Sequence, residues 1–198
     1  MNSTPLIPRP LLFFAIGFSL LMLALQSVQP NLLYQRESIL AGEAWRLWTG
    51  NFVHTNITHL ALNLAGFWVF LLLCGQTQRL KFLIFSIIFC AFIVGIGLFL
   101  FNPQIIWYAG FSGIQYGLFL AGGIVLVIES EKVYGSALLM LVIGKMLMDA
   151  FTPTEQLSQS LIEAPVIHQA HWYGAIAGIV STFPRIFQAI QHQPAPHV

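Results

Sequence analysis

Residues 109–119, AGFSGIQYGLF, set one serine between two glycines at the point where a long apolar run begins. Gly110 and Gly113 allow a tight turn and leave room above Ser112, and the first free N–H groups of a helix starting here point to the same place. Such N–H groups stabilise a developing oxyanion. The stretch therefore favours a nucleophile at a helix N-terminus, although Gly/Ser clusters at the ends of membrane helices also occur without function.

The composition identifies the class of protein around this stretch. Of the 198 residues, 57% are hydrophobic and 8% are charged, and the formal net charge is +1. A soluble domain is much less apolar, so the composition predicts a polytopic membrane protein. No cluster of Lys and Arg is present in the sequence, so nucleic acid is not expected as a partner. Cys74 and Cys90 fall in apolar runs and are interpreted as buried hydrophobic residues rather than as a disulfide.

Six apolar segments predict membrane-spanning helices, and they cover residues 11–25, 57–75, 82–101, 112–128, 133–150 and 167–183. The predicted fold class is an all-α membrane protein, a bundle of six transmembrane helices in one domain over residues 1–198. A short tail (1–10) precedes the bundle, and a disordered tail (about 186–198) follows it. A cleaved signal peptide is an alternative for the first segment, but no small-x-small cleavage site follows it. The mixed residues 31–56 suit a loop partly embedded at the membrane surface.

The distribution of cations predicts the orientation in the membrane. If both termini lie on one side, five cations share that side and three lie opposite, namely Arg9, Arg79, Lys81, Lys132 and Arg185 against Arg36, Arg46 and Lys145. This split favours a cytoplasmic N-terminus. Ser112 then opens toward the extracytoplasmic side.

Polar residues inside the second apolar segment are candidates for function. His59 and Asn63 are four residues apart, so they share one face of a helix and can aim two donors at one point. His54 lies five residues before His59 and nearer the surface. A single histidine most often makes a structural hydrogen bond, whereas a polar pair within a membrane helix favours function.

His171 begins the sixth segment, three residues before Gly174. Gly174 and Gly178 form one row of small residues, and Gly113, Gly117 and Ala121 form another on the fourth segment. If the two rows face each other, His171 reaches Ser112, which is the pairing of base and nucleophile that acyl transfer requires. Lys145 and Asp149 are interpreted as a mutually satisfied pair, with Asp149 as an orienter of the histidine as the alternative.

Together these residues resemble the rhomboid intramembrane serine proteases. The matching positions are Trp45-Arg46, His54, His59, Asn63, Gly110-x-Ser112-Gly113 and Ala170-His171-x-x-Gly174. The resemblance implies Ser112 as nucleophile, His171 as base, and an oxyanion hole made by Asn63, His59 and the Ser112 backbone N–H. It also implies that the histidine packs on Tyr116. No cofactor or metal ion is implied, and the implied partners are the lipid bilayer and single-span membrane proteins that are cut.

Within that family, the run Gly42-x-x-Trp45-Arg46-Leu47-x-Thr49-Gly50-x-x-x-His54 is most similar to the bacterial rhombosortase subgroup. This resemblance implies a protein of the bacterial inner membrane whose substrates carry a C-terminal sorting segment containing Gly-Gly. Phe111 and Trp172 are bulkier than the usual residues of the family, and we expect them to narrow the approach to Ser112. The oligomeric state is left open.

Two other functions fit parts of the pattern. A catalytically inactive relative would bind membrane helices without cutting them, but the intact Ser112 and His171 argue against it. A metal-dependent protease or transporter would use histidines as ligands, namely His54, His59, His168 and His171. The sequence has no H-E-x-x-H motif, which makes the metal alternative the weaker one.

Overall fold

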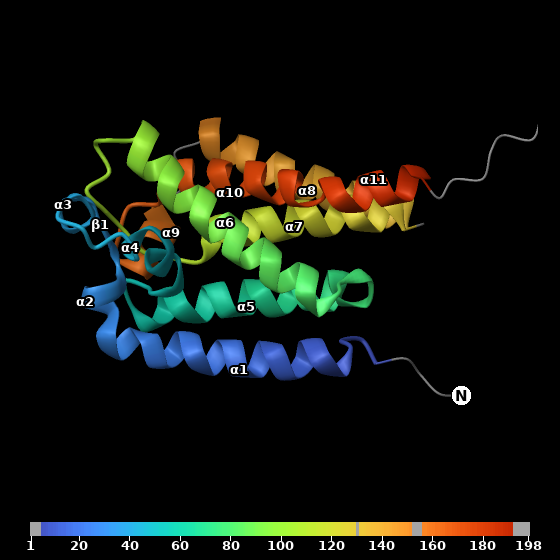
Figure 1. Cartoon of the computed structure of the whole chain (residues 1–198), viewed down its shortest axis with the longest axis horizontal. Coiled ribbons are helices and arrows are strands. Elements are labelled where there is room, and N and C mark those ends of the chain that lie inside the picture. The colour runs from blue at the N-terminus through green and yellow to red at the C-terminus, as the bar shows by residue number, and fades with distance from the viewer. Residues whose placement is uncertain (1–4, 130, 152–155, 192–198) are drawn as a thin grey trace, which may run out of the picture.

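The protein is a bundle of apolar helices, seen in a computed structural model that describes residues 5–129, 131–151 and 156–191. The long elements of the bundle are α1 (Arg9–Leu25), α5 (Ile57–Cys74), α6 (Leu80–Phe101), α7 (Ser112–Ile128), α8 (Lys132–Phe151) and α10 (His168–Ser181) (Figure 1). The start of α1 and the end of α11 (Phe183–Gln191) lie at one end of the bundle. The predicted all-α class is confirmed.

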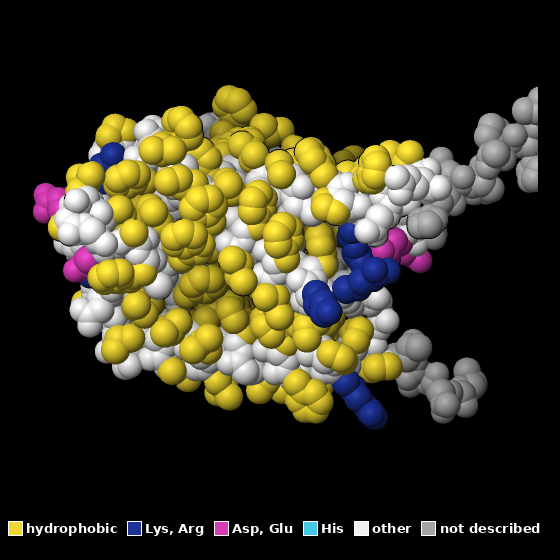
Figure 2. All heavy atoms as spheres, in the orientation of Figure 1, with side chains coloured by type: hydrophobic (Ala, Val, Ile, Leu, Met, Phe, Trp, Pro, Cys, Tyr) yellow, Lys and Arg dark blue, Asp and Glu magenta, His cyan; other side chains and the backbone are white. Residues whose placement is uncertain are grey.

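The lengths of the helices support a multi-pass membrane protein. Four segments are long and apolar enough to cross a bilayer, namely Arg9–Leu32, Ile57–Thr77, Leu80–Phe101 and Lys132–Phe151. α7 and α10 are shorter, with 17 and 14 residues. Figure 2 shows apolar side chains over the middle of the molecule and charged ones gathered at its two ends, the distribution that a bilayer requires. The count of six spans stays a prediction.

One end of the chain differs from the sequence-based expectation. α1 ends at Leu25, as the predicted segment 11–25 does, and the short elements η1 (Gln26–Val28) and α2 (Gln29–Leu32) follow it. The predicted disordered tail begins at about residue 186, whereas α11 extends to Gln191 and the remaining residues 192–198 lie outside the described residues. Phe183, Phe187 and Ile190 recur at helical spacing and stay exposed, so α11 has one apolar face.

Small residues let α7 and α10 touch at the level of the backbone. A Cβ added at Gly174 would fall on the carbonyl of Gly113, and one added at Gly178 would fall on the carbonyl of Gly117. The two rows of small residues therefore face each other, as the sequence predicts, and no bulkier residue fits between them. This close packing fixes the start of α10 against the start of α7.

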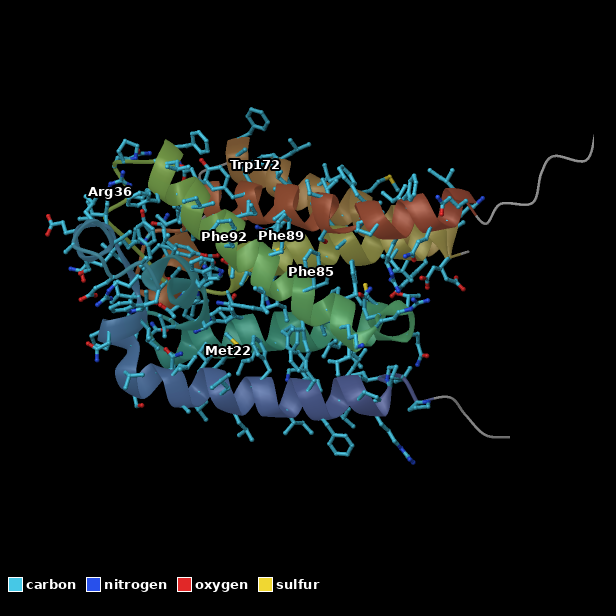
Figure 3. The ribbon with its side chains drawn as sticks, in the orientation of Figure 1. Met22, Arg36, Phe85, Phe89, Phe92 and Trp172 are labelled. Atoms are coloured by element: carbon cyan, nitrogen blue, oxygen red, sulfur yellow. The ribbon has the colours of Figure 1, made fainter. Side chains whose placement is uncertain are left out.

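Residues 31–56 form a folded surface segment with short elements that the sequence does not predict. β1 (Tyr34–Gln35) pairs antiparallel with β2 (Trp107–Tyr108), and α3 (Arg36–Leu40), α4 (Arg46–Thr49) and η2 (Gly50–Phe52) follow β1. The ring of Trp48 stacks on Phe92 of α6 with 4.8 Å between centroids, and Figure 3 shows Phe85, Phe89 and Phe92 along that helix. Because β2 leads directly to Ser112, the segment braces the entry to α7.

α1 packs against α5 and against Phe111, the residue before Ser112. Met22 is fully buried and projects from α1 toward α5 (Figure 3). Phe18 packs on Phe67 of α5 and on Phe111, with ring centroids 5.2 and 5.4 Å apart. Two further short elements complete the order, η3 (Gly75–Thr77) after α5 and α9 (Gln156–Ile162) before α10. α9 lies between the fifth and sixth predicted segments, 133–150 and 167–183.

Candidate active site

Ser112 and His171 lie at the starts of two helices that pack together. Oγ of Ser112 is 3.0 Å from Nε2 of His171, within hydrogen-bond distance. The contact depends on the small residue that follows the serine, because a Cβ added at Gly113 would lie 2.8 Å from the carbonyl oxygen of Ala170. Gly113 is therefore needed for close approach rather than for the turn expected from the sequence, since its backbone is helical.

Gly110 is the residue that turns the chain before Ser112. Its φ of +136° lies in the region that favours glycine. A Cβ at this position would also lie 2.9 Å from Cε1 and Nε2 of His59, so the missing side chain makes room for the imidazole. The hydroxyl of Tyr108 donates to the carbonyl of Gly110 at 2.6 Å and holds the turn. The turn and the imidazole thus require the same glycine.

His59 and Asn63 approach Ser112 from α5. Asn56 caps this helix by accepting a hydrogen bond from the backbone N–H of His59 at 2.8 Å. Nδ1 of His59 is 3.0 Å from Oγ1 of Thr55, so its Nε2 is the nitrogen on the Gly110 side. Nδ2 of Asn63 donates to the carbonyl of His59 at 3.0 Å. Both side chains are buried and line the same cavity as Ser112 and His171.

Tyr116 supports the imidazole of His171 from one turn along α7. The two ring centroids are 4.5 Å apart with 34° between the planes. The hydroxyl of Tyr116 donates to Oδ2 of Asp149 at 3.3 Å, and Asp149 pairs with Lys145 at 2.5 Å. Asp149 therefore forms the expected ion pair with Lys145. It also accepts a hydrogen bond from Tyr116, whose ring packs against His171.

A cavity of about 820 Å³ opens beside these groups. Its polar end contains Ser112, His59, Asn63 and His171, and its apolar walls come from α5 and α8, among them Leu62, Val69, Leu73, Leu138, Leu141 and Val142. The walls follow the length of two membrane helices, so the cavity can take an apolar peptide segment and bring one end of it to Ser112.

The Rhomboid domain family matches residues 41–187 of this chain. The chain belongs to the rhomboid family. Its members are generally intramembrane serine proteases, although inactive members exist. A comparison with curated proteins finds no match. Ser112, His171, His59 and Asn63 all fall inside the matched region.

His54 lies behind the site of this rhomboid domain. Its backbone N–H donates to Oε1 of Gln26 at 2.9 Å, and its ring meets the ring of His59 edge-on with 4.9 Å between centroids. Burial, and next the neighbouring His59, lower the pKa of His54 to about 3, so this side chain is neutral at neutral pH. His54 does not line the cavity, and its contacts are those of a support for His59.

Trp45 and Arg46 lie in the surface segment, away from the cavity. Nη1 of Arg46 donates to the carbonyls of Pro30 and Leu33 at 3.0 and 2.8 Å, and Nε of Trp45 donates to the carbonyl of Asn31 at 3.4 Å. Arg46 is buried and pairs with Glu43 at 2.5 Å. The two residues hold the chain at residues 30–33 against the start of α4.

Phe111 and Trp172 do not narrow the approach to Ser112, so that expectation is wrong. Phe111 is fully buried among aromatic rings of the core, and Trp172 is 41% exposed on α10. Neither residue lines the cavity. The physical reason for Phe111 is the turn at Gly110, which directs the next side chain into the core while Ser112 begins the helix.

Gln115 is a site residue that the sequence analysis missed. Its Nε2 donates to the carbonyl of Asn63, and it lines the cavity. Gly66 leaves the room for this contact, because a Cβ there would lie 2.6 Å from Nε2 of Gln115. The signal was present in the spacing, since Gln115 follows Ser112 by three residues and shares its helix face.

The histidines expected for a metal alternative do not all come together. Within the part of the chain that the structure describes, the group of three or more metal-ligating side chains that lie close together consists of Asp149, His168 and His171. His54 and His59 lie outside this group.

Proposed function

We propose that the protein is an intramembrane serine endopeptidase that uses Ser112 and His171 as a catalytic dyad. The observation that carries the proposal is the 3.0 Å contact between Oγ of Ser112 and Nε2 of His171 at the polar end of an apolar cavity. Burying a neutral serine and a neutral histidine in a membrane costs less free energy than burying an ion pair, which suits a site at the start of a membrane helix.

The positions of the donors and acceptors support the following reaction. His171 accepts the hydroxyl proton of Ser112 as the oxygen attacks the peptide carbonyl, and it then gives that proton to the leaving amine. The backbone N–H of Ser112 and the side chains of Asn63 and His59 hold the oxyanion that forms. The Tyr116 ring packs against the imidazole of His171 and limits its movement during both transfers. Water then hydrolyses the acyl-enzyme by the reverse sequence.

The substrate is a single-span membrane protein whose apolar segment lies along the walls from α5 and α8. A helical peptide bond hides its carbonyl in the backbone hydrogen-bond ladder, so the segment has to unwind before Ser112 can reach it. Glycine favours unwinding, and the resemblance to rhombosortases points to a Gly-Gly sequence at the top of the segment. Cleavage there releases the extracytoplasmic part.

The orientation that this requires is an N-terminus on the cytoplasmic side of the bacterial inner membrane. It rests on the five-to-three distribution of cations between the two faces. The start of α7 then opens to the extracytoplasmic side.

The test is a cleavage assay with defined substrates. The purified protein in lipid vesicles is incubated with single-span polypeptides that carry Gly-Gly at the extracytoplasmic end, and the products are mapped by mass spectrometry. We expect one cut near the glycines, absent with the Ser112→Ala variant. Binding of these substrates without any cut, under conditions in which the fold is intact, would favour an inactive rhomboid and overturn the proposal.

A further inference from the structure

Three side chains that can ligate a metal ion lie close together, and one of them is His171 of the dyad. Asp149, His168 and His171 each offer one ligand atom, and these atoms all lie within 4.8 Å of one another. His168 and His171 are three residues apart at the start of α10, so they share a helix face, and their rings lie 5.7 Å apart. Asp149 reaches the same point from the end of α8.

The set of donors suits one class of ion. Two imidazole nitrogens and a carboxylate oxygen are ligands of Zn²⁺, whereas Mg²⁺ and Ca²⁺ prefer oxygen alone. With bonds of about 2.0–2.1 Å, the ligand atoms of a tetrahedral zinc site lie roughly 3.4 Å apart, so the three groups need to close by about 1.5 Å at most. Two of them can do so by side-chain rotation, because Asp149 and His168 are only partly buried.

The surroundings supply access and support. Asp149 and His171 line the cavity of about 820 Å³, through which an ion can enter. The hydroxyl of Tyr116 already donates to Oδ2 of Asp149, and a hydrogen bond to a ligating carboxylate orients it. Lys145 competes for the same carboxylate, but its side chain is 57% exposed and can turn away on its flexible stem.

We propose that Asp149, His168 and His171 bind Zn²⁺ and that the bound ion switches the dyad off. A neutral imidazole has a single nitrogen lone pair. Whichever nitrogen of His171 binds the ion, no lone pair remains to accept the proton of Ser112. Binding of the ion follows from the cluster alone, whereas the inhibition rests on the proposed function.

The binding test uses the full-length Ser112→Ala variant, so that it does not depend on proteolysis. Zn²⁺ is titrated into the detergent-solubilised protein by calorimetry. We expect one site, weakened at least about tenfold by a further His168→Ala change, because loss of even a supporting partner costs a metal site that much. Gln169→Ala, the adjacent position, is the matched control and should leave the affinity unchanged. Equal Zn²⁺ affinity with and without His168 would overturn the proposal.

A second variant should move the affinity in the opposite direction. Lys145→Met removes the cation that competes for Asp149, so Zn²⁺ should bind more tightly than to the parent protein. Unfolding would expose the buried thiols of Cys74 and Cys90 to the ion, so far-UV circular dichroism has to show that Lys145→Met keeps the parent fold. With the fold kept, this variant keeps the test decisive if His168→Ala folds poorly. Unchanged or weaker binding in Lys145→Met would count against the site.

The activity test then addresses the switch. In the protein with Ser112 intact, Zn²⁺ should stop cleavage, EDTA should restore it, and Mg²⁺ should have no effect. With His168→Ala, the half-inhibitory Zn²⁺ concentration, measured against that variant's own metal-free rate, should rise at least about tenfold. An unchanged value would refute the switch. Absence of any cleavage without metal would refute the proposed function instead, and the calorimetric result would still stand.

Discussion

Oγ of Ser112 lies 3.0 Å from Nε2 of His171, although 59 positions of sequence separate the two residues. The contact is a consequence of helix packing, because α7 and α10 meet backbone to backbone at Gly113 and Gly174. Catalysis and helix packing therefore depend on neighbouring positions. Substitutions at Ser112 and His171 test the first, and a substitution at Gly174 tests the second.

Ser112 and His171 should act as one unit. We expect Ser112→Ala and His171→Ala each to abolish cleavage, and the double variant to be no worse than either, since a nucleophile without its base is already inactive. The measurement is the single-turnover rate in vesicles, with far-UV circular dichroism as a check on the fold. Substantial cleavage by either single variant would exclude the dyad.

Asn63 should stabilise the transition state rather than bind substrate. Asn63→Ala should lower kcat by about 10²–10³ with little change in KM, the usual loss for one oxyanion donor. Leu62→Ala is the matched control, because Leu62 lines the same cavity with an apolar side chain and should change mainly KM. An Asn63→Ala effect confined to KM would make Asn63 a substrate contact.

The contact between α7 and α10 should tolerate no added methyl group. A Cβ at Gly174 would overlap the carbonyl of Gly113, so we expect Gly174→Ala to cost about 1–3 kcal/mol or more and to lower the thermal midpoint. A Cβ at Gly144 of α8 would meet nothing within 4 Å, and Gly144→Ala should be neutral or stabilise by up to about 1 kcal/mol. Similar midpoints for the two variants would contradict the packing argument.

His54 should make the fold sensitive to acid. The pKa of His54 is lowered from 6.5 to about 3 by burial and then by His59. Between these two values, His54 is protonated in the unfolded chain and neutral in the folded one. Its contribution to stability is intact above about pH 6.5 and is lost progressively as the pH falls toward about 3. His54→Gln should flatten the fall in stability by at most about 1.4 kcal/mol per pH unit. An unchanged slope between about pH 7 and 5 would show that His54 is not buried in its neutral form.

Cleavage should occur where the substrate helix unwinds most easily. Replacing the Gly-Gly pair of a single-span substrate by Leu-Leu should slow the cut more than the same change deeper in the segment, because glycine costs a helix about 1 kcal/mol relative to alanine. Mass spectrometry of the products locates the cut. Equal sensitivity along the whole segment, or cutting at the cytoplasmic end, would refute both this substrate and the proposed orientation.

Much of the bundle could be predicted because membrane helices are uniformly apolar. The span predicted for 112–128 coincides with α7, and the segment predicted for 57–75 differs from α5 by one residue. The facing rows of small residues were also predictable, since glycines at helical spacing on two segments favour close contact between the helices. The surface segment, residues 31–56, could not be predicted, because it consists of short or irregular elements. The pairing of Tyr34 with Tyr108 involves strands of two residues, too short for any periodic signal.

The details of the site were predictable only at positions where the residue type suits a single structural role. A glycine before Ser112 indicated a turn, and the positive φ of Gly110 bears this out. Gln115 was missed because a glutamine on a helix face has many uses, and its contact with the carbonyl of Asn63 depends on the space left by Gly66. The direction of Phe111 was mistaken because it depends on how the turn meets the core.

Covalent labelling of Ser112 tests the central claim most directly. A fluorophosphonate reacts with a serine whose hydroxyl is activated by a neighbouring base. We expect the intact protein in vesicles to gain one phosphonyl group, located on Ser112 by peptide mass spectrometry, and His171→Ala to lose the labelling while its fold is kept. Labelling at another serine, or equal labelling of Ser112 with and without His171, would contradict the dyad.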